Sequence, residues 1–258
     1  MGIKYGAFQS IGMKETESGG VELELDSIDP EELPSVSILS VVDNPEDYIS
    51  ILLYNWNQLT YASDKREWII IDIGTQPIED YIPIADHTNI RYTHCPGMEP
   101  HEALNTACEQ ASHDLCCIMD DSTYYYPDHL VVKVSAHLTY GSNILTADVP
   151  IFSRGTFYVH PQIKKHVKTN AISYPSILFT KQYWHDNPFT SDVWTFVGRR
   201  FNQWKDVKFP FNCIRIHLDT VNQVPSEYIT IPYTAPFPPS FQYILEKYHQ
   251  AHNRTSSL

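Results

Sequence analysis

The chain has 258 residues, and its 31 acidic residues outnumber its 18 Lys and Arg residues, which gives a formal net charge of −13 at pH 7. A partner for nucleic acid or for an anionic membrane needs clustered basic side chains, so this charge argues against both. A nucleotide ligand remains open, because a metal ion can supply the positive charge. No apolar run reaches the ~18 residues of a membrane span.

Two observations predict a cytosol-like compartment. The segment Met1–Tyr5 lacks the basic and apolar stretches that begin a signal peptide. The five cysteines include no Cys-x-x-Cys pair, and this pattern is typical of reduced thiols in a core rather than of a disulfide framework. We therefore expect a cytoplasmic protein, located in the host cytoplasm if its source is a virus.

In chain order, an acidic segment comes first, and a regular alternation of expected strands and helices follows up to residue 145. Residues 1–33 are acidic and predict an arm, in which Val21–Leu25 alternates in the manner of an edge strand. From Pro34 onward, apolar runs of strand length alternate with segments of helical spacing, which predicts βαβ units and a parallel sheet. The expected strands are Val36–Val42, Trp68–Asp72, Asn89–Thr93 and Cys116–Met119, and the expected helices are Tyr48–Leu59 and His101–Ala111.

The second half of the chain is more mixed. A proline-rich connector at 232–239 precedes a terminal amphipathic helix at Ser240–His252. The expected strands are Ile144–Ala147, Thr156–Val159, Ser176–Phe179 and Ile214–Leu218, and another helix is expected at Val193–Trp204.

The most informative segment is the apolar strand that runs directly into Asp120 and Asp121. Adjacent acids repel each other and lose hydration at the edge of a core, so a cation or a hydrogen-bond network must compensate them. Oxygen ligands suit Mg²⁺ or Mn²⁺, and ligands of open α/β sheets bind at the carboxyl ends of strands. Alternatively, the two acids form a turn or cap the helix that begins near Pro127.

Five segments then show a resemblance to a known family. Val36–Tyr61 is a strand and a helix that ends in Asn-Gln-Leu-Thr-Tyr. The others read Ile-Ile-Asp-Ile-Gly-Thr (70–75), Met-Asp-Asp-Ser with Tyr-Pro-Asp-His-Leu (119–130), Ser-Asp-Val-Trp-Thr-Phe (191–196) and Ile-Arg-Ile-His (214–217). In this order they resemble the first strand and helix and the VDDGS, DxD, ED and YRIH segments of family 2 glycosyltransferases. The DxD region is most similar to that of the spore-coat polysaccharide type.

The resemblance implies an α/β fold of the GT-A (Rossmann-like) type, with a mostly parallel central sheet flanked by helices and a mixed acceptor-side half. It divides the chain into the arm at 1–33, a nucleotide-sugar-binding half at 34–145, an acceptor-binding half at 146–235, and a C-terminal helix and tail at 236–258. The implied activity is that of a hexosyltransferase, which transfers sugar from a nucleoside diphosphate sugar to a hydroxyl of a glycan or protein acceptor. The oligomeric state is left open.

The resemblance also assigns the donor side of the site. A diphosphate leaves readily only when its charge is neutralised, which a bound Mn²⁺ or Mg²⁺ achieves. Asp121 would bind this ion directly, and His217 would complete its ligand shell or touch the diphosphate. Asp120 would lie near the ribose or a metal-bound water, and Asp72 would hydrogen-bond the base or ribose. The full set of expected donor-binding residues is Val42, Asp72, Asn105 and Asp120.

On the acceptor side, one carboxylate must take the proton of the attacking hydroxyl. The resembling family places this base in the ED motif, so the resemblance implies Asp192 as the catalytic base and a single displacement with inversion.

Several of these residues have a structural alternative. Asp72 precedes Gly74 and would also serve in a turn, and Asp192 follows Ser191 at an expected helix start, where it would serve as an N-cap. His217 lies on an apolar strand and would also serve as a structural histidine. The tyrosines at 124–126 would either stack on a sugar or pack at a strand–helix junction.

Four positions depart from the family pattern, and they define an alternative function. Ile73 and Ser191 each stand where an acid is usual, Leu104 replaces an Arg, and Ser122 replaces the third acid of the DxD region. The alternative is a catalytically inactive GT-A-like module that binds a partner or a glycan. A nucleotidyltransferase is disfavoured, because the turn after Val36–Val42 offers neither a glycine-rich loop nor a lysine.

Overall fold

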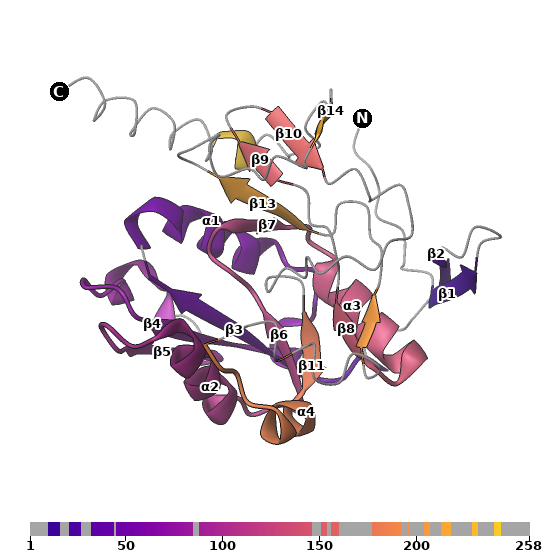
Figure 1. Cartoon of the computed structure of the whole chain (residues 1–258), viewed down its shortest axis with the longest axis horizontal. Helices are drawn as coiled ribbons and strands as arrows, with labels where there is room; N and C mark the ends of the chain where they lie inside the picture. Colours follow the sequence, from indigo (N-terminus) through magenta and orange to yellow (C-terminus); the bar gives the residue numbers. More distant parts are fainter. Residues whose placement is uncertain are drawn as a thin grey trace.

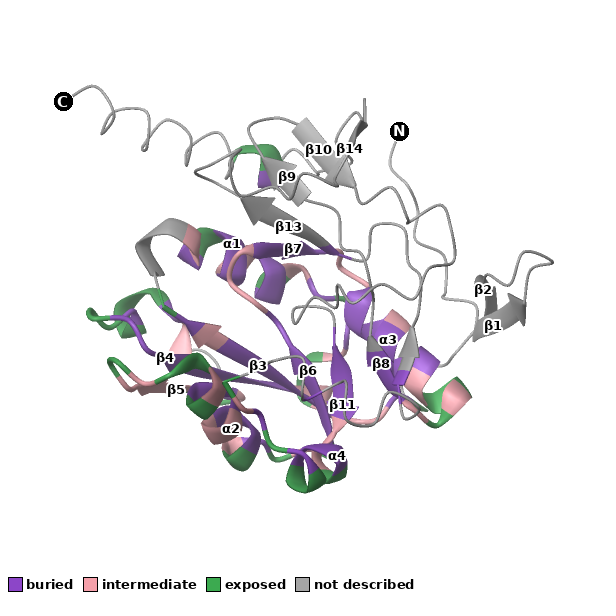
Figure 2. Ribbon diagram, in the orientation of Figure 1, coloured by how far each residue is buried: buried purple, intermediate pink, exposed green. Residues whose placement is uncertain are grey.

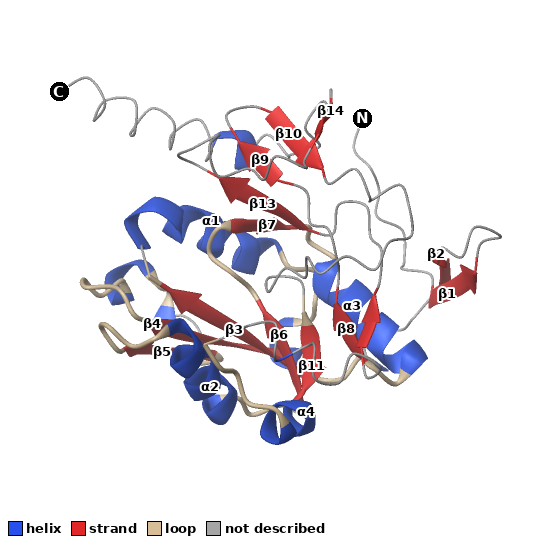
Figure 3. Ribbon diagram, viewed as in Figure 1, coloured by secondary structure: helices blue, strands red, loops and turns tan. Residues whose placement is uncertain are grey.

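The computed structural model describes residues 10–15, 21–26, 32–43, 45–84, 88–145, 151–153, 156–159, 177–191, 196, 204–206, 213–217, 229–231 and 240–243. Its central layer is a seven-stranded sheet with the order β12-β8-β11-β6-β3-β4-β5 (Figure 1). Helices flank this sheet, as Figure 3 shows. The predicted α/β fold with a mostly parallel sheet is confirmed.

Four parallel strands form the part of the sheet that lies nearest to the acid pair. β3 lies between β6 and β4, and β5 forms the edge beyond β4. β3 and β4 are buried along nearly their whole length, as expected for strands covered on both faces. The strands are β3 (Val36–Val42), β4 (Arg66–Asp72), β5 (Ile90–His94) and β6 (Leu115–Ile118).

Three shorter strands complete the sheet from the chain beyond residue 142. β11 (Leu178–Thr180) runs antiparallel to β6 and to β8 (Asn143–Leu145), and β12 (Trp204–Asp206) runs parallel to β8. The two halves of the chain therefore share one sheet. The prediction of a helix through Trp204 was wrong at that residue, because pairing with β8, more than fifty residues away, imposes extended structure there.

Successive helices along the chain cover opposite faces of the sheet. α1 (Pro45–Gln58) and α3 (His129–Tyr140) pack on one face, while α2 (Pro100–Gln110) and α4 (Lys181–Asp186) pack on the other. β3 and β6, at the centre of the sheet, are almost entirely buried between these helices (Figure 2).

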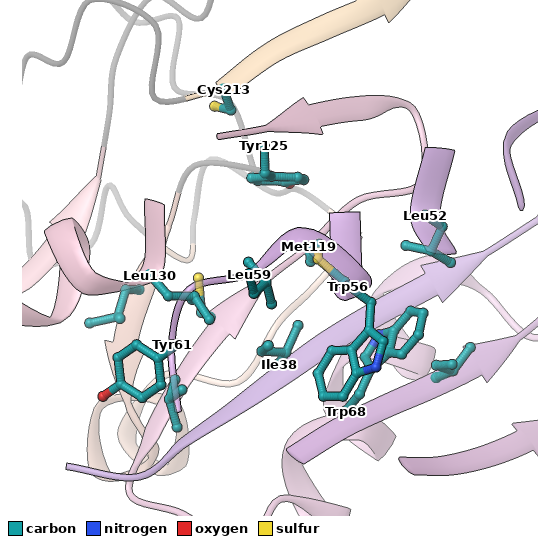
Figure 4. Packing of buried hydrophobic residues seen from close by; sticks show 14 of the residues in the cluster. Ile38, Leu52, Trp56, Leu59, Tyr61, Trp68, Met119, Tyr125, Leu130 and Cys213 are labelled. Atoms are coloured by element: carbon teal, nitrogen blue, oxygen red, sulfur yellow. The ribbon is translucent and has the colours of Figure 1, made fainter. Parts of the chain in front are cut away.

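On the α1 face, Trp56 stacks on Trp68 with ring centroids 5.0 Å apart (Figure 4). α3 ends at Gly141, whose φ of 60° suits a residue without Cβ.

A second, five-stranded sheet lies beside α1, in the order β14-β10-β9-β13-β7 (Figure 1). The chain leaves the first sheet at Ile118 and enters the second sheet at Thr123, so the acid pair occupies the short passage between the two sheets. The strands are β7 (Thr123–Tyr125), β9 (Ile151–Ser153), β10 (Thr156–Val159), β13 (Cys213–His217) and β14 (Ile229–Ile231).

The acidic arm contains the expected edge strand. β2 (Val21–Asp26) pairs antiparallel with β1 (Ser10–Glu15), and the two form a separate two-stranded ribbon. In the part of the chain that the structure describes, no helix combines the length and apolarity that crossing a bilayer requires.

A buried carboxylate fixes the amino edge of the parallel strands. Glu67 on β4 is 5% exposed. It accepts hydrogen bonds from the Ser37 hydroxyl at 2.6 Å and the Ser112 amide at 2.5 Å, and it pairs with Arg91 at 3.1 Å. Burial alone would raise the pKa of Glu67, but these hydrogen bonds and the Arg91 charge lower it below its usual value.

We expect Glu67→Gln to lower the free energy of unfolding by about 1–3 kcal/mol, because charge-assisted hydrogen bonds are lost. Because the pKa of Glu67 is lower in the folded state, its ionised carboxylate stabilises the protein at pH values above the unfolded-state pKa of about 4.3. This stabilisation is lost as the pH falls through the folded-state pKa. The variant should therefore lose less stability than the wild type below that pH in urea titrations. Glu109→Gln, an exposed exchange on α2, is the control and should leave the acid limb unchanged.

Candidate functional site

The register of the parallel strands brings the acids to one edge of the sheet. Asp72 ends β4 directly beside Val42, which ends β3. On the other side of β3, Ile118 lies opposite Leu39, and the pairing continues through a 2.9 Å hydrogen bond from the Met119 amide to the Leu39 carbonyl. Asp120 and Asp121 follow at the carboxyl end of β3, about two strand spacings, or ~10 Å, from Asp72. This is the edge at which α/β sheets bind ligands.

Asp120 closes the turn between the two sheets. Its Oδ1 accepts hydrogen bonds from the Ser122 amide at 2.7 Å, the Ser122 hydroxyl at 2.6 Å and the Thr123 hydroxyl at 3.2 Å. An aspartate that binds its own backbone two residues on is a turn-forming device. The turn alternative is therefore correct for this oxygen, while Oδ2 accepts no hydrogen bond from the described residues.

Asp121 differs from its neighbour in its electrostatic surroundings. Burial raises the pKa of Asp121 well above its usual value, and the charges of Asp120 and Asp43 raise it further. No described basic side chain forms an ion pair with these three acids; Arg91 pairs with Glu67 at the opposite edge of the sheet. A cation bound at this edge would favour the charged form of Asp121 and offset the repulsion among the acids.

Side chains of α1 hold β7, the strand that follows the acid turn. The Asn55 amide donates to the Thr123 carbonyl at 2.6 Å and accepts from the Tyr125 amide at 3.0 Å, and so takes the place of a neighbouring strand. Gln58 donates to the Tyr125 carbonyl at 2.5 Å. On its other side, β7 pairs with β13. These contacts fix the direction in which the chain leaves the acid turn.

The Tyr125 side chain reaches back to the acids. The Asp120 amide donates to its hydroxyl oxygen at 2.9 Å, and the ring is completely buried among the core residues that Figure 4 shows around Met119 and Cys213. Burial raises the pKa of Tyr125 well above its usual value, and the Asp120 charge adds to this effect. The phenol therefore stays neutral and remains available to accept the hydrogen bond.

Asp72 is completely buried, and three internal donors occupy its carboxylate. Oδ1 accepts from the Gly74 amide at 3.0 Å, and Oδ2 accepts from the Ile78 amide at 3.1 Å and the Tyr92 hydroxyl at 2.6 Å. The Asp72 charge adds to burial in raising the pKa of Tyr92. These bonds shape the loop at 73–78, so the turn role is observed, and a contact between Asp72 and a nucleotide stays a prediction.

Asp72→Asn should lower the free energy of unfolding by about 1–3 kcal/mol, because an amide NH₂ would face a donor where the carboxylate now accepts. Denaturant unfolding measures this loss. Asp80→Asn, an exposed exchange just beyond the same loop, serves as the control. Equal stability of the two variants would contradict the loop-shaping role.

Val42 and Asn105 were also expected to bind the donor. Val42 lies at the edge between the acids, and its carbonyl accepts a hydrogen bond from the Ile73 amide at 2.8 Å. Asn105, on α2, donates to the Phe189 carbonyl at 2.9 Å and accepts from the Phe189 amide at 2.9 Å and the Trp184 indole at 2.8 Å. The Asn105 amide thus anchors the segment after α4, and a donor contact by either residue remains a prediction.

Asp192 and His217 are the remaining predicted site residues. Asp192 lies outside the described residues, although Ser191 before it is described. The backbone of His217 ends β13, and β13 pairs with β7 so that Arg215 lies opposite Thr123. His217 lies two residues beyond Arg215 on β13 and pairs with Ser153 on β9.

A pocket of about 370 Å³ lies elsewhere in the described structure. Asn143 begins β8, and Thr180 lies opposite Leu115, the first residue of β6, so both belong to the edge of the sheet opposite the acids. The pocket is polar and is lined by His137, Gly141, Ser142, Asn143, Thr180, Gln182, Tyr183 and Asp186. It is therefore not the cleft expected for a donor at Asp121.

The structure also identifies positioning residues that the sequence reasoning missed. Asn55 and Tyr125 hold the acid turn, and their partners lie about seventy residues away or across the turn. The sequence signal for Asn55 was weak: a polar residue between the buried Leu52 and Trp56 on α1. Periodicity alone does not reveal which backbone group such an amide binds.

The acid edge fits a hard divalent ion. Among the described side chains, no group of three or more His, Cys, Asp and Glu residues is arranged to hold a metal. Mg²⁺ does not require such a cage, because it is commonly held by one or two carboxylates together with substrate phosphates and water. The Oδ2 of Asp120, which accepts no hydrogen bond from the described residues, and the carboxylate of Asp121 would provide this donor set.

Comparison with known proteins supports the fold. No protein-family model matches the sequence, and neither does any curated protein. The structure of S. aureus TarS residues 1–349 in complex with UDP-GlcNAc matches with a TM-score of 0.58 and 14% identity, covering 72% of this chain and 59% of that one. The mannosyltransferase PcManGT from Pyrobaculum calidifontis, in complex with GDP-Man and Mn²⁺, matches with a TM-score of 0.55 and 16% identity, covering 87% and 71%.

These matches establish an α/β fold of the kind found in GT-A glycosyltransferases. The chain spans about 60% of the length of the TarS fragments that it matches. At these identities the likeness concerns the fold alone, and it does not support the predicted resemblance to the spore-coat type.

Proposed function

We propose that the protein is a metal-dependent glycosyltransferase that moves a sugar from a nucleoside diphosphate sugar to an acceptor hydroxyl. The observation that carries the proposal is the position of Asp120 and Asp121 at the carboxyl edge of the sheet, where no described basic side chain forms an ion pair with them. The fold supports it, because TarS and PcManGT were solved with the nucleotide sugars UDP-GlcNAc and GDP-Man.

On the donor side, Asp121 would hold Mn²⁺ or Mg²⁺ directly, and the Oδ2 of Asp120 would bind a ligand of the ion or the ribose. The bound ion would neutralise the diphosphate as it leaves. The chain's own contribution is to preorganise the acids, which the Asp120 turn and the Tyr125 hydrogen bond do before any ligand arrives. The structure of PcManGT with Mn²⁺ supports this choice of ion.

On the acceptor side, we propose Asp192 as the base that takes the proton of the attacking hydroxyl, with inversion at the anomeric carbon. This assignment rests on the resemblance of Ser191–Phe196 to the ED motif. His217 is proposed to contact the ion or the diphosphate, and the pairing of β13 with β7, which sets Arg215 opposite Thr123 directly after the acid turn, supports this role. Val42, Asp72 and Asn105 are retained as proposed donor neighbours.

A second candidate is a catalytically inactive module of the same fold. Two observations favour it: the polar atoms of Asp72 and Asn105 are engaged in internal hydrogen bonds, and Ile73 stands where the family usually has an acid. The two candidates differ in turnover. Calorimetry with Mn²⁺ and a panel of nucleotide sugars, followed by a transfer assay, separates them, because the inactive module would bind without transfer.

Asp121→Asn should weaken Mn²⁺-dependent nucleotide binding by more than ~100-fold, since even indirect changes near a metal cost 10–100-fold in affinity. Isothermal calorimetry with and without Mn²⁺ measures this change. Asp128→Asn is a matched control, because Asp128 is also half-buried near the turn and burial also raises its pKa. Unchanged nucleotide affinity of the Asp121 variant in Mn²⁺ would refute its role as a metal ligand.

Asp192→Asn should leave donor binding intact and slow transfer by about 10²–10⁴-fold, which is the usual contribution of a general base. The measurement is kcat for transfer beside the dissociation constant of the donor. Asp186→Asn on α4 serves as the control and should transfer at the wild-type rate. Wild-type turnover in the Asp192 variant would exclude it as the base.

A further inference from the structure

Lys133 is a buried lysine, and packing alone does not explain why a charged side chain occupies this position. It lies on the inner face of α3 and is 0% exposed. Its ammonium nitrogen has no hydrogen-bond partner among the described residues. Taking an ammonium out of water is unfavourable even after the surroundings relax. A methionine would fill the same volume without that cost, so the charge itself requires an explanation.

The other buried charges of the described core are treated differently. The carboxylates of Glu67 and Asp72 each accept three polar contacts from neighbouring groups. Lys133 instead faces an aromatic ring: its Nζ lies 5.9 Å from the ring centroid of Tyr125. An ammonium within about 6 Å of an aromatic face is attracted to the ring, and this attraction grows when both groups are shielded from water.

Tyr125 connects this ammonium to the acid turn. Its ring contacts Lys133 and, at a centroid distance of 4.6 Å, the ring of His129, one turn earlier on the same helix. Its hydroxyl oxygen accepts the Asp120 amide at 2.9 Å. Lys133 is therefore connected to the turn through one cation–π contact and one hydrogen bond. Tyr125, which makes both of them, is completely buried.

The charges of Lys133 and Asp120 also act on a common group. The pKa of the Cys213 thiol is raised to about 12, chiefly by burial; the Lys133 charge opposes this rise, and the Asp120 charge adds to it. Lys133 and Asp120 therefore lie within electrostatic reach of the same buried region, and their opposite signs attract.

We propose that Lys133 is a positioning residue for the turn that carries Asp120 and Asp121. Its ammonium orients the Tyr125 ring, and the Tyr125 hydroxyl in turn fixes the Asp120 amide. The role of the turn in metal binding rests on the proposed function. The positioning of the turn by Lys133 does not depend on it.

The test is hydrogen exchange of the Asp120 amide, followed by NMR on the full chain. Lys133→Met should accelerate exchange of this amide by about 2- to 30-fold, which corresponds to the usual strength of a cation–π contact. Global stability should be unchanged or higher, because a buried charge is removed. Ser135→Ala is the matched control: Ser135 is equally buried on α3, its hydroxyl also lacks a partner among the described residues, and its exchange should leave the Asp120 amide unaffected.

Two further variants keep the proposal testable if Lys133→Met does not fold. Tyr125→Phe keeps the ring and removes the acceptor, so it should accelerate Asp120 exchange, whereas Lys133→Arg keeps the charge and should preserve the wild-type rate. In Lys133→Met or Tyr125→Phe, a wild-type exchange rate at Asp120 would overturn the proposal. So would equal acceleration in Lys133→Met and Ser135→Ala.

A second readout separates this inference from the proposed function. Titration with Mn²⁺ and UDP should show an affinity loss in Lys133→Met similar in factor to the change in exchange, with full affinity in Ser135→Ala. If the wild type binds none of the nucleotides of the panel in Mn²⁺, the proposed function fails, while the exchange measurement still decides the role of Lys133. If the wild type and Lys133→Met bind the nucleotide equally well in Mn²⁺, and the exchange rate of the Asp120 amide is also unchanged, only the positioning role of Lys133 fails.

Discussion

The structure depends on how the chain passes from one sheet to the other between Ile118 and Thr123. Four residues separate these strand ends, so a tight turn is required at the edge of the core. Asp120 closes the turn with its own carboxylate, and Tyr125 holds its amide from the opposite side. These hydrogen bonds restrain the turn, which presents the neighbouring Asp121 at the edge where strands of α/β sheets meet their ligands.

Helix α1 connects the two sheets. One of its faces packs through Leu52 and Trp56 against the seven-stranded sheet. Asn55 and Gln58 bind the backbone of β7, so the second sheet begins on the surface of this helix. A displacement of α1 would move β7 and hence the acid turn, which couples the packing of the core to the geometry of the site.

The buried charges fall into two groups. Glu67 and Asp72 are saturated with hydrogen bonds and stabilise the amino edge and the 73–78 loop. The Asp121 carboxylate has no ion-paired basic side chain among the described residues, and the Lys133 ammonium has no hydrogen-bond partner among them; both residues belong to the region around the acid turn. Uncompensated charge is costly in a core, and proteins retain it mainly where a ligand or a reaction uses it. This contrast is the physical reason for proposing the turn as the functional site.

The sequence by itself determined the alternating strands and helices of the first half, because long apolar runs and helical spacing are local signals. It also indicated the acid pair and its position at a strand end. Only the tertiary structure decided that Tyr124 and Tyr125 form a strand, that Trp204 joins the first sheet, and that Asn55, Tyr125 and Lys133 surround the turn. These outcomes depend on partners distant in the chain or on the direction of buried side chains, and a local pattern does not encode either of them.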